Sequence, residues 1–88
     1  MKHKFGDFLR EKRIKAGLSQ KEVALGLGYT TPQFISNWER GLSNPPINSI
    51  RKLGNMLKLK EDELFEMYLK SVIDEVTKSL KRKFYGRI

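Results

Sequence analysis

Apolar residues recur at intervals of three and four along most of the chain, and glycine or proline marks nearly every interruption of this pattern. Such spacing places the apolar side chains on one face of an α-helix. No stretch of useful length shows the alternation of β-branched and aromatic residues that is typical of a strand. The pattern therefore predicts an all-α fold built from five helices.

The first two helices are predicted at residues 5–15 and from Ser19 to just before Gly28. Four apolar residues form the inner face of the first helix: Phe5, Phe8, Leu9 and Ile14. Gly17 follows it at the position that favours a left-handed C-terminal cap. Ser19 and Glu22 have the spacing of a capping box, in which each side chain bonds to the backbone of the other residue. The inner face of the second helix consists of Val23, Ala24 and Leu27.

The third helix is predicted to begin at about Thr31 and to end at Gly41. Pro32 suits its first position, where the missing N–H would be unpaired in any case. Ile35 and Trp38 are three residues apart and are expected to face the core. A fourth helix follows, with an apolar stripe at four positions: Ile47, Ile50, Leu53 and Leu57.

The last helix is predicted from near Glu61 to about Lys83, which is long for so small a domain. We divide the chain into a domain at residues 1–69 and a helical extension with a basic tail at residues 70–88. Five apolar residues stand at packing intervals along this helix: Leu69, Val72, Ile73, Val76 and Leu80. They form either a homodimer interface or a face that folds back on its own domain. The tail at residues 81–87 either touches DNA or frays in solvent.

The chain of 88 residues has a formal net charge of +8. Lys and Arg outnumber Asp and Glu by 12 to 4 in residues 1–60 and balance them at six each in residues 61–88. This excess favours a polyanionic partner through counterion release. The chain has no cysteine, one histidine (His3) and no apolar run of the ~18 residues that a membrane span needs. We therefore expect a cytoplasmic protein without a metal, another cofactor or a membrane contact.

The second and third predicted helices are short and closely linked, as in a helix-turn-helix. Ala24 permits a close crossing of the two helices, and Gly28 permits a sharp turn between them. The outer side of the third helix is polar at four positions: Gln33, Ser36, Asn37 and Arg40. The major groove of B-DNA is wide enough to admit a helix of this kind.

Four segments in fixed order carry a family resemblance: GLSQKEVA at residues 17–24, LGY at 27–29, ISNWERG at 35–41 and NPP at 44–46. The chain resembles the Cro/cI-type helix-turn-helix family, which is also called the xenobiotic-response-element or lambda-repressor-like family. The resemblance covers residues 5–69. It implies a five-helix lambda-repressor-like domain that binds operator DNA, here followed by an extended C-terminal helix.

The resemblance also implies roles for the residues at matching positions. Four side chains are expected to read DNA bases: Thr31, Gln33, Ser36 and Asn37. Five are expected to bind phosphates: Gln20, Lys21, Arg40, Ser43 and Asn44. Gln20 is also expected to brace the third helix. Arg13 and Glu39 match a pair that forms a structural salt bridge between the first and third helices. Capping of its own helix remains the alternative for Gln33, and a phosphate or water contact remains the alternative for Ser36. For Arg40 the alternative is a solvated charge at the C-terminal end of the helix.

One interval departs from the commonest family pattern, because the distance from Gly28 to Ile35 is one residue longer. The additional residue lies within residues 29–32 and either lengthens the turn or extends the helix start. Pro32 also stands where many relatives carry a polar reader. Its side chain cannot form a hydrogen bond, although it could touch a thymine methyl group. We therefore expect the N-terminal end of this helix to contact DNA differently from the same helix end in most relatives.

Three functions fit these features. The leading one is a sequence-specific transcriptional regulator of double-stranded DNA, a repressor that acts as a homodimer on a palindromic operator. The second is an antitoxin that binds its operator and a toxin. The protein partner that we consider is thus a toxin or an anti-repressor. The third is a protein-interaction module that has lost operator reading, against which the polar outer face argues. An enzyme is not expected, because no nucleophile–base arrangement and no phosphate-binding loop stand out.

Overall fold

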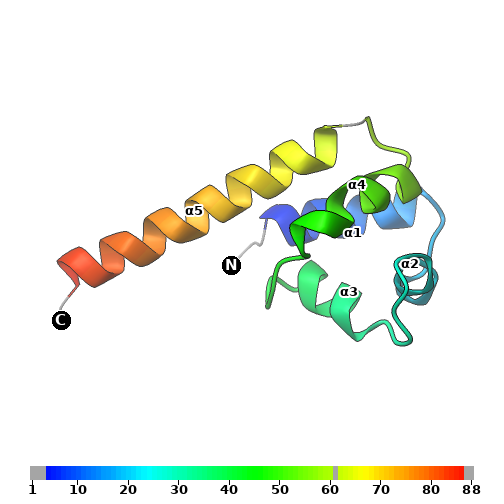
Figure 1. The fold of residues 1–88 in the computed structure, drawn as a ribbon, viewed down its shortest axis with the longest axis horizontal. Helices are drawn as coiled ribbons and strands as arrows, with labels where there is room; N and C mark the ends of the chain where they lie inside the picture. Colours follow the sequence, from blue (N-terminus) through cyan, green and yellow to red (C-terminus); the bar gives the residue numbers. More distant parts are fainter. Residues whose placement is uncertain (1–3, 61, 87–88) are drawn as a thin grey trace.

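The computed structural model describes residues 4–60 and 62–86, and within these ranges it contains five α-helices and no strand. The helices are α1 (Lys4–Lys15), α2 (Gln20–Gly26), α3 (Gln33–Glu39), α4 (Ile47–Met56) and α5 (Glu63–Tyr85). Helices α1 to α4 and the start of α5 form a compact body, and the rest of α5 projects from it (Figure 1). The predicted all-α fold of five helices is confirmed. His3, Glu61 and Arg87 lie outside the described residues.

One hydrophobic core holds the five helices together. Ten buried residues form it: Phe5, Leu9, Val23, Ala24, Ile35, Trp38, Ile50, Leu53, Leu57 and Leu64. Every helix or its immediate end supplies at least one of these side chains, so burial of the core fixes α2 and α3 against their neighbours. Trp38 belongs to the core, as its spacing from Ile35 predicts.

Two apolar residues that the pattern places inside are exposed instead. Ile14 is 53% exposed and Ile47 is 54% exposed. The buried face of α1 runs through Phe5, Leu9 and Arg13 at intervals of four residues. The residue after Arg13 therefore points about 100° away from this face. Ile47 is the first residue of α4 and lies ahead of the residues that reach the core.

The turn between α2 and α3 depends on a left-handed residue. Gly28 has a φ of +93°, a region that glycine enters without the steric cost of a Cβ atom. The N–H of the next residue, Tyr29, donates to the carbonyl oxygen of Ala24 at 2.9 Å. This bond closes the end of α2 and directs the chain toward α3.

Helix α3 begins at Gln33, which is later than the prediction. Pro32 precedes the helix with φ −79° and ψ 2°, so the prediction that it occupies the first helical position is wrong. The Thr31 hydroxyl accepts the N–H of Gln33 at 3.3 Å and satisfies one of the free donors at the helix start. The Thr31 hydroxyl therefore pairs one donor at the helix start. Proline at the first helical position would instead have removed a donor.

The surroundings of α5 change along its length. Leu64 is buried, and Met67 and Tyr68 pack on the core. Beyond them, the Asn44 Nδ2 amide donates to Glu75 Oε1 at 2.9 Å. In the described residues that follow, α5 projects away from the body, so the alternative in which this helix folds back on its own domain is wrong for the part of α5 after Glu75 (Figure 1). Residues 81–85 continue the helix and are exposed, so this part of the tail is solvated but not frayed.

Candidate nucleic-acid interface

Helix α2 is fixed at its start by a complete capping box. The Ser19 hydroxyl accepts the N–H of Glu22 at 3.0 Å, and the Glu22 carboxylate accepts the N–H of Ser19 at 2.8 Å. These two bonds satisfy N–H groups that have no partner inside the helix. The inner face of this short helix is anchored by Val23 and Ala24, which are fully buried.

A buried ion pair connects α1 to the C-terminal end of α3. Arg13 Nε lies 2.6 Å from Glu39 Oε2, and Arg13 Nη2 donates to Glu39 Oε1 at 3.0 Å. The guanidinium also donates to the carbonyl oxygen of Leu18 at 2.9 Å, and Gln20 Nε2 donates to Glu39 Oε1 at 3.0 Å. Arg13 and Glu39 are only 9% and 6% exposed, so these bonds compensate the loss of hydration of both charges.

The same end of α3 lies very close to the backbone of α1. A Cβ atom added at Gly6 would overlap the carbonyl oxygens of Trp38 and Glu39. Glycine at this position therefore permits the approach that brings Arg13 and Glu39 together. The ion pair and the close approach hold α3 at one angle on the body, which a helix needs in order to present its outer side to a partner.

Aromatic packing supports the inner side of α3. Ile35 and Trp38 are buried in the core. Tyr29 follows the turn and packs its ring at 6.0 Å from Trp38 and at 4.8 Å from Phe34, measured between ring centroids. Helix α3 is thus held from inside by its own apolar residues and from the side by the turn.

The outer side of α3 carries a connected polar array, formed by Gln33, Asn37 and Arg40. Gln33 Nε2 donates to Asn37 Oδ1 at 2.9 Å, and Arg40 Nη2 donates to the same oxygen at 2.9 Å. Gln33 and Arg40 are exposed, whereas Asn37 and the neighbouring Ser36 are half-buried. The intervals of four and three residues place these side chains on one helical face.

The chemistry of this array orients both amides. Arg40 has only donors, so the atom that it contacts on Asn37 must be the oxygen. Asn37 Oδ1 then accepts from Gln33, which requires the Gln33 amide nitrogen to face inward along the array. Within the array, these bonds leave the Asn37 amide nitrogen, the Gln33 amide oxygen and Arg40 Nη1 for an outside partner. The array therefore offers both donor and acceptor groups.

The five predicted phosphate ligands differ in what their side chains contact. Lys21 and Ser43 are exposed on α2 and on the α3–α4 connection, and Arg40 lies in the array. Gln20 donates to Glu39, and Asn44 donates to Glu75 of α5. Thr31, which is exposed beside the start of α3, is placed next to Gln33 by its contact with the N–H of that residue.

One of these contacts has no signal in the sequence, since Asn44 and Glu75 are 31 residues apart and no repeat or motif pairs them. The contact of Gln20 with Glu39 agrees with the family position of Gln20, which is expected to brace the third helix. The array on α3 has such a signal, since residues three and four positions apart are neighbours on a helix. The sequence identifies each member of the array separately, and the hydrogen bonds between them appear only in the structure.

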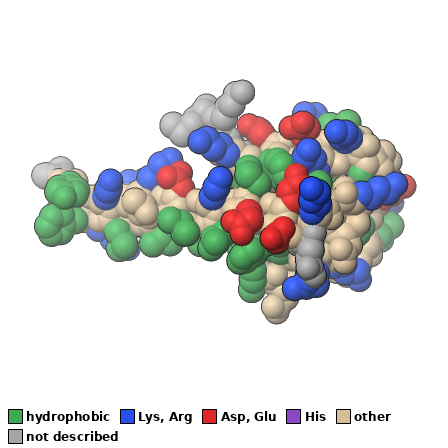
Figure 2. Space-filling view, turned by 90° about the horizontal axis from the view of Figure 1, so that it is seen from above, with side chains coloured by type: hydrophobic (Ala, Val, Ile, Leu, Met, Phe, Trp, Pro, Cys, Tyr) green, Lys and Arg blue, Asp and Glu red, His purple; other side chains and the backbone are tan. Residues whose placement is uncertain are grey.

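The predicted dimer residues all lie on α5. Leu69, Ile73, Val76 and Leu80 are exposed, and Val72 is half-buried. Hydrophobic side chains form a row along one side of the projecting helix (Figure 2). Among the described residues, no group of His, Cys, Asp and Glu could hold a metal ion, and no helix is long and apolar enough to cross a membrane.

Comparison with known proteins agrees with this arrangement. A family model described as Helix-turn-helix matches residues 9–64, which include α2, the turn, α3 and α4. The chain therefore belongs to the Cro/cI-type helix-turn-helix family, with the lambda-repressor-like fold. It is 34% identical over 80 residues to the HTH-type transcriptional regulator ImmR of Bacillus subtilis (strain 168). The match covers 85% of this chain, and the chain spans about three fifths (61%) of the length of that relative.

Proposed function

We propose that this protein is a DNA-binding transcriptional regulator that inserts α3 into the major groove of operator DNA. The observation that carries the proposal is the polar array of Gln33, Asn37 and Arg40 on a helix whose inner side is anchored in the core. A rigid helix with an ordered donor and acceptor can discriminate base edges, because each base pair presents its own pattern of these groups in the major groove. The relative in Bacillus subtilis is named as a transcriptional regulator.

In this proposal Gln33 and Asn37 read bases, and Thr31 and Ser36 contact the edge of the same groove. Phosphate contacts come from two groups of residues, which differ in how free their side chains are. Lys21 and Ser43 are exposed, with no side-chain bond of this kind to the described residues. Arg40 is exposed but also donates to Asn37, whereas Gln20 and Asn44 must share their amide groups with Glu39 and Glu75. Phosphate contacts of this kind position a protein on DNA without reading its sequence.

The regulator acts as a repressor, and two copies bind the two halves of a palindromic operator. A two-fold dimer of identical domains matches a two-fold DNA sequence, which doubles the number of base contacts. Support for the second copy comes from α5, whose exposed apolar residues extend beyond the body. The positive charge of residues 1–60 favours DNA over a neutral partner.

Selection of bound sequences from a random pool of double-stranded DNA tests this function. The parent chain is expected to enrich one palindromic sequence. The Asn37→Ala variant should enrich a less defined sequence, whereas Asn55→Ala, a matched change at an exposed residue of α4, should enrich the parent sequence. Binding without any enriched sequence in the parent chain would overturn the proposal and favour an interaction module that no longer reads DNA.

The exposed face of α5 also supports one other function, an antitoxin that covers this face with a toxin. Purification from the native cell separates the two. A small protein that remains bound at a fixed ratio through α5 would favour the antitoxin, whereas the chain alone in pairs favours the homodimer.

A further inference from the structure

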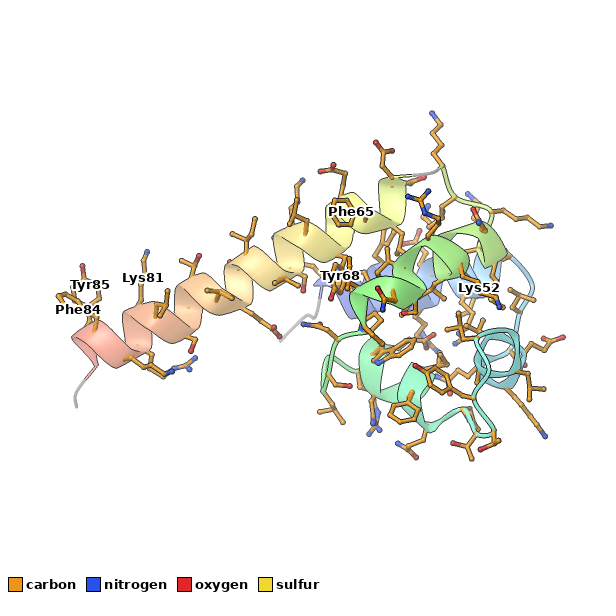
Figure 3. All side chains as sticks on the ribbon, in the orientation of Figure 1. Lys52, Phe65, Tyr68, Lys81, Phe84 and Tyr85 are labelled. Carbon is orange, nitrogen blue, oxygen red and sulfur yellow. The ribbon has the colours of Figure 1, made fainter. Side chains whose placement is uncertain are left out.

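Six exposed apolar residues form a continuous seam along α5, and we call them the apolar seam: Phe65, Leu69, Ile73, Val76, Leu80 and Phe84. They are 37–80% exposed. The row of hydrophobic side chains in Figure 2 follows this side of the helix. Phe65 lies near the body and Phe84 at the far end, so the seam runs along most of α5 (Figure 3). Such a row along a projecting helix indicates an interface, since an isolated helix of this length is only marginally stable in water.

The spacing of the seam is the same in both directions. From Phe65 to Phe84 the intervals are four, four, three, four and four residues. A second α5 that runs antiparallel, with its Val76 opposite Ile73, therefore also brings Leu80 opposite Leu69 and Phe84 opposite Phe65. One two-fold axis between residues 74 and 75 produces all six contacts at once.

Charge selects the antiparallel direction over the parallel one. Residues 62–75 contain five acidic residues and one lysine, whereas residues 76–86 contain four basic residues and no acidic residue. A parallel pair would place like charges together along both halves. An antiparallel pair places the acidic half of each helix beside the basic half of the other, and it also opposes the two helix dipoles.

One flank of the seam shows this complementarity at the level of residues. Glu66 follows Phe65, and Lys81 follows Leu80, so both lie on the same side of the seam at about 100° per residue. The two-fold axis brings Lys81 of one copy to the side of Glu66 of the other. Lys81 is on the distal part of α5, far along the helix from Phe65 (Figure 3).

We infer that the occupant of the apolar seam is α5 of a second copy of this chain, antiparallel and in the register that pairs Phe65 with Phe84, Leu69 with Leu80 and Ile73 with Val76. The inference rests on the proposed homodimer and adds its geometry. The two bodies then lie at opposite ends of the helix pair, so the length of α5 sets the separation of the two α3 helices.

Single-cysteine variants test the register, because the chain has no cysteine of its own. In the antiparallel pair, Leu69 of one copy lies beside Leu80 of the other, whereas two Leu69 residues are 11 positions apart, or about 16 Å at 1.5 Å per residue. A disulfide needs Cα atoms within about 7 Å. Leu69→Cys and Leu80→Cys are therefore each expected to form little disulfide dimer alone, and the mixture of the two should form at least tenfold more.

Leu25→Cys, at an exposed residue of α2, gives the background of random collisions for the cross-linking. If each seam variant cross-links to itself and the mixture gives no gain, the helices are parallel, and the register is wrong while the homodimer stands. If all variants stay at background and the parent chain has a monomeric mass, both the register and the homodimer are wrong. Reading of DNA by α3 is tested separately by the sequence selection and can survive either result.

Charge reversal provides a second test that leaves the apolar seam intact. Glu66→Lys and Lys81→Glu are each expected to raise the dimer dissociation constant by about fivefold at low salt, as the loss of exposed ion pairs does. An equimolar mixture of the two variants should restore association. In the mixed dimer, the side chain at position 66 of each copy meets an opposite charge at position 81 of the other copy. Failure of the mixture to associate better than either variant alone would contradict the antiparallel arrangement.

Discussion

The body and the projecting part of α5 use the same spacing of apolar residues with opposite results. In the body, this spacing leads to ten buried apolar side chains. The two buried charges beside them, Arg13 and Glu39, form an ion pair with each other. Along α5, the same spacing leads to the apolar seam, which remains exposed. Periodicity therefore identifies the face of a helix that needs a partner. Apolar residues that lie beside the other helices of the body are covered by the same chain. Apolar residues further along α5 need another partner.

The largest effect is expected at the ion pair of the body. Arg13→Met should lower the free energy of unfolding by about 3–5 kcal/mol, because it leaves the Glu39 carboxylate buried without its main partner. Lys78→Met removes the pair that Lys78 forms with Asp74 at 3.1 Å on the exposed surface of α5. It should change stability by less than about 0.5 kcal/mol. Urea unfolding of both variants measures the contrast, and similar losses would contradict it.

Truncation of leucine compares the two regions directly. Leu53→Ala should cost about 2–5 kcal/mol because it opens a cavity in the core. Leu80→Ala should cost less than about 0.5 kcal/mol when the chain is dilute enough to be monomeric, since the side chain is already exposed. A large loss of monomer stability in Leu80→Ala would show that α5 packs on the body.

A methyl group at the α1–α3 contact tests the close approach. Gly6→Ala should destabilise the chain by about 1–3 kcal/mol, because neither the Trp38 nor the Glu39 carbonyl group can move without shifting α3. Gly17→Ala provides the comparison, since its φ is +76° but no atom lies within 4 Å of the added carbon. The strain there is of the order of 1 kcal/mol. Thermal melts of the two variants should therefore rank Gly6→Ala below Gly17→Ala.

The smallest effect is expected from a single phosphate contact. Lys21→Ala should weaken binding to all DNA sequences about equally and reduce the slope of log affinity against log salt concentration by about 1. Lys70→Ala removes the same charge from α5 and should leave the slope nearly unchanged. A change of sequence preference in Lys21→Ala would assign this lysine to base reading instead.

The parts of the fold that local pattern controls could be predicted from the sequence. The capping box at Ser19, the turn at Gly28 and the core positions Ile35 and Trp38 all follow from spacing and residue type. The nearly helical spacing of Ile14 from the other apolar residues predicts a core position for it. The structure places Arg13 on the buried face instead, because its ion pair compensates the charge.

Contacts between distant elements could not be predicted in the same way. The bond from Asn44 to Glu75 exists because α5 leaves the body at one particular angle, and no local pattern encodes that angle. The start of α3 also lies later than the pattern predicts, because a hydroxyl of Thr31 and a proline ring both suit a helix start. At the candidate site, residue types and spacing identified the outer side of α3, whereas the orientation of its amides required the contact with Arg40.

Base reading by the outer side of α3 is tested most directly by affinity for a selected site and for its single-base variants at one salt concentration. The parent chain should distinguish the selected base pair from its replacement by about 1–3 kcal/mol at the position that Asn37 meets. Asn37→Ala should lose this discrimination, and Lys21→Ala should retain it while binding every site more weakly. If Asn37→Ala binds the selected site as tightly as the parent chain and with the same preference at every position, α3 does not read DNA through Asn37.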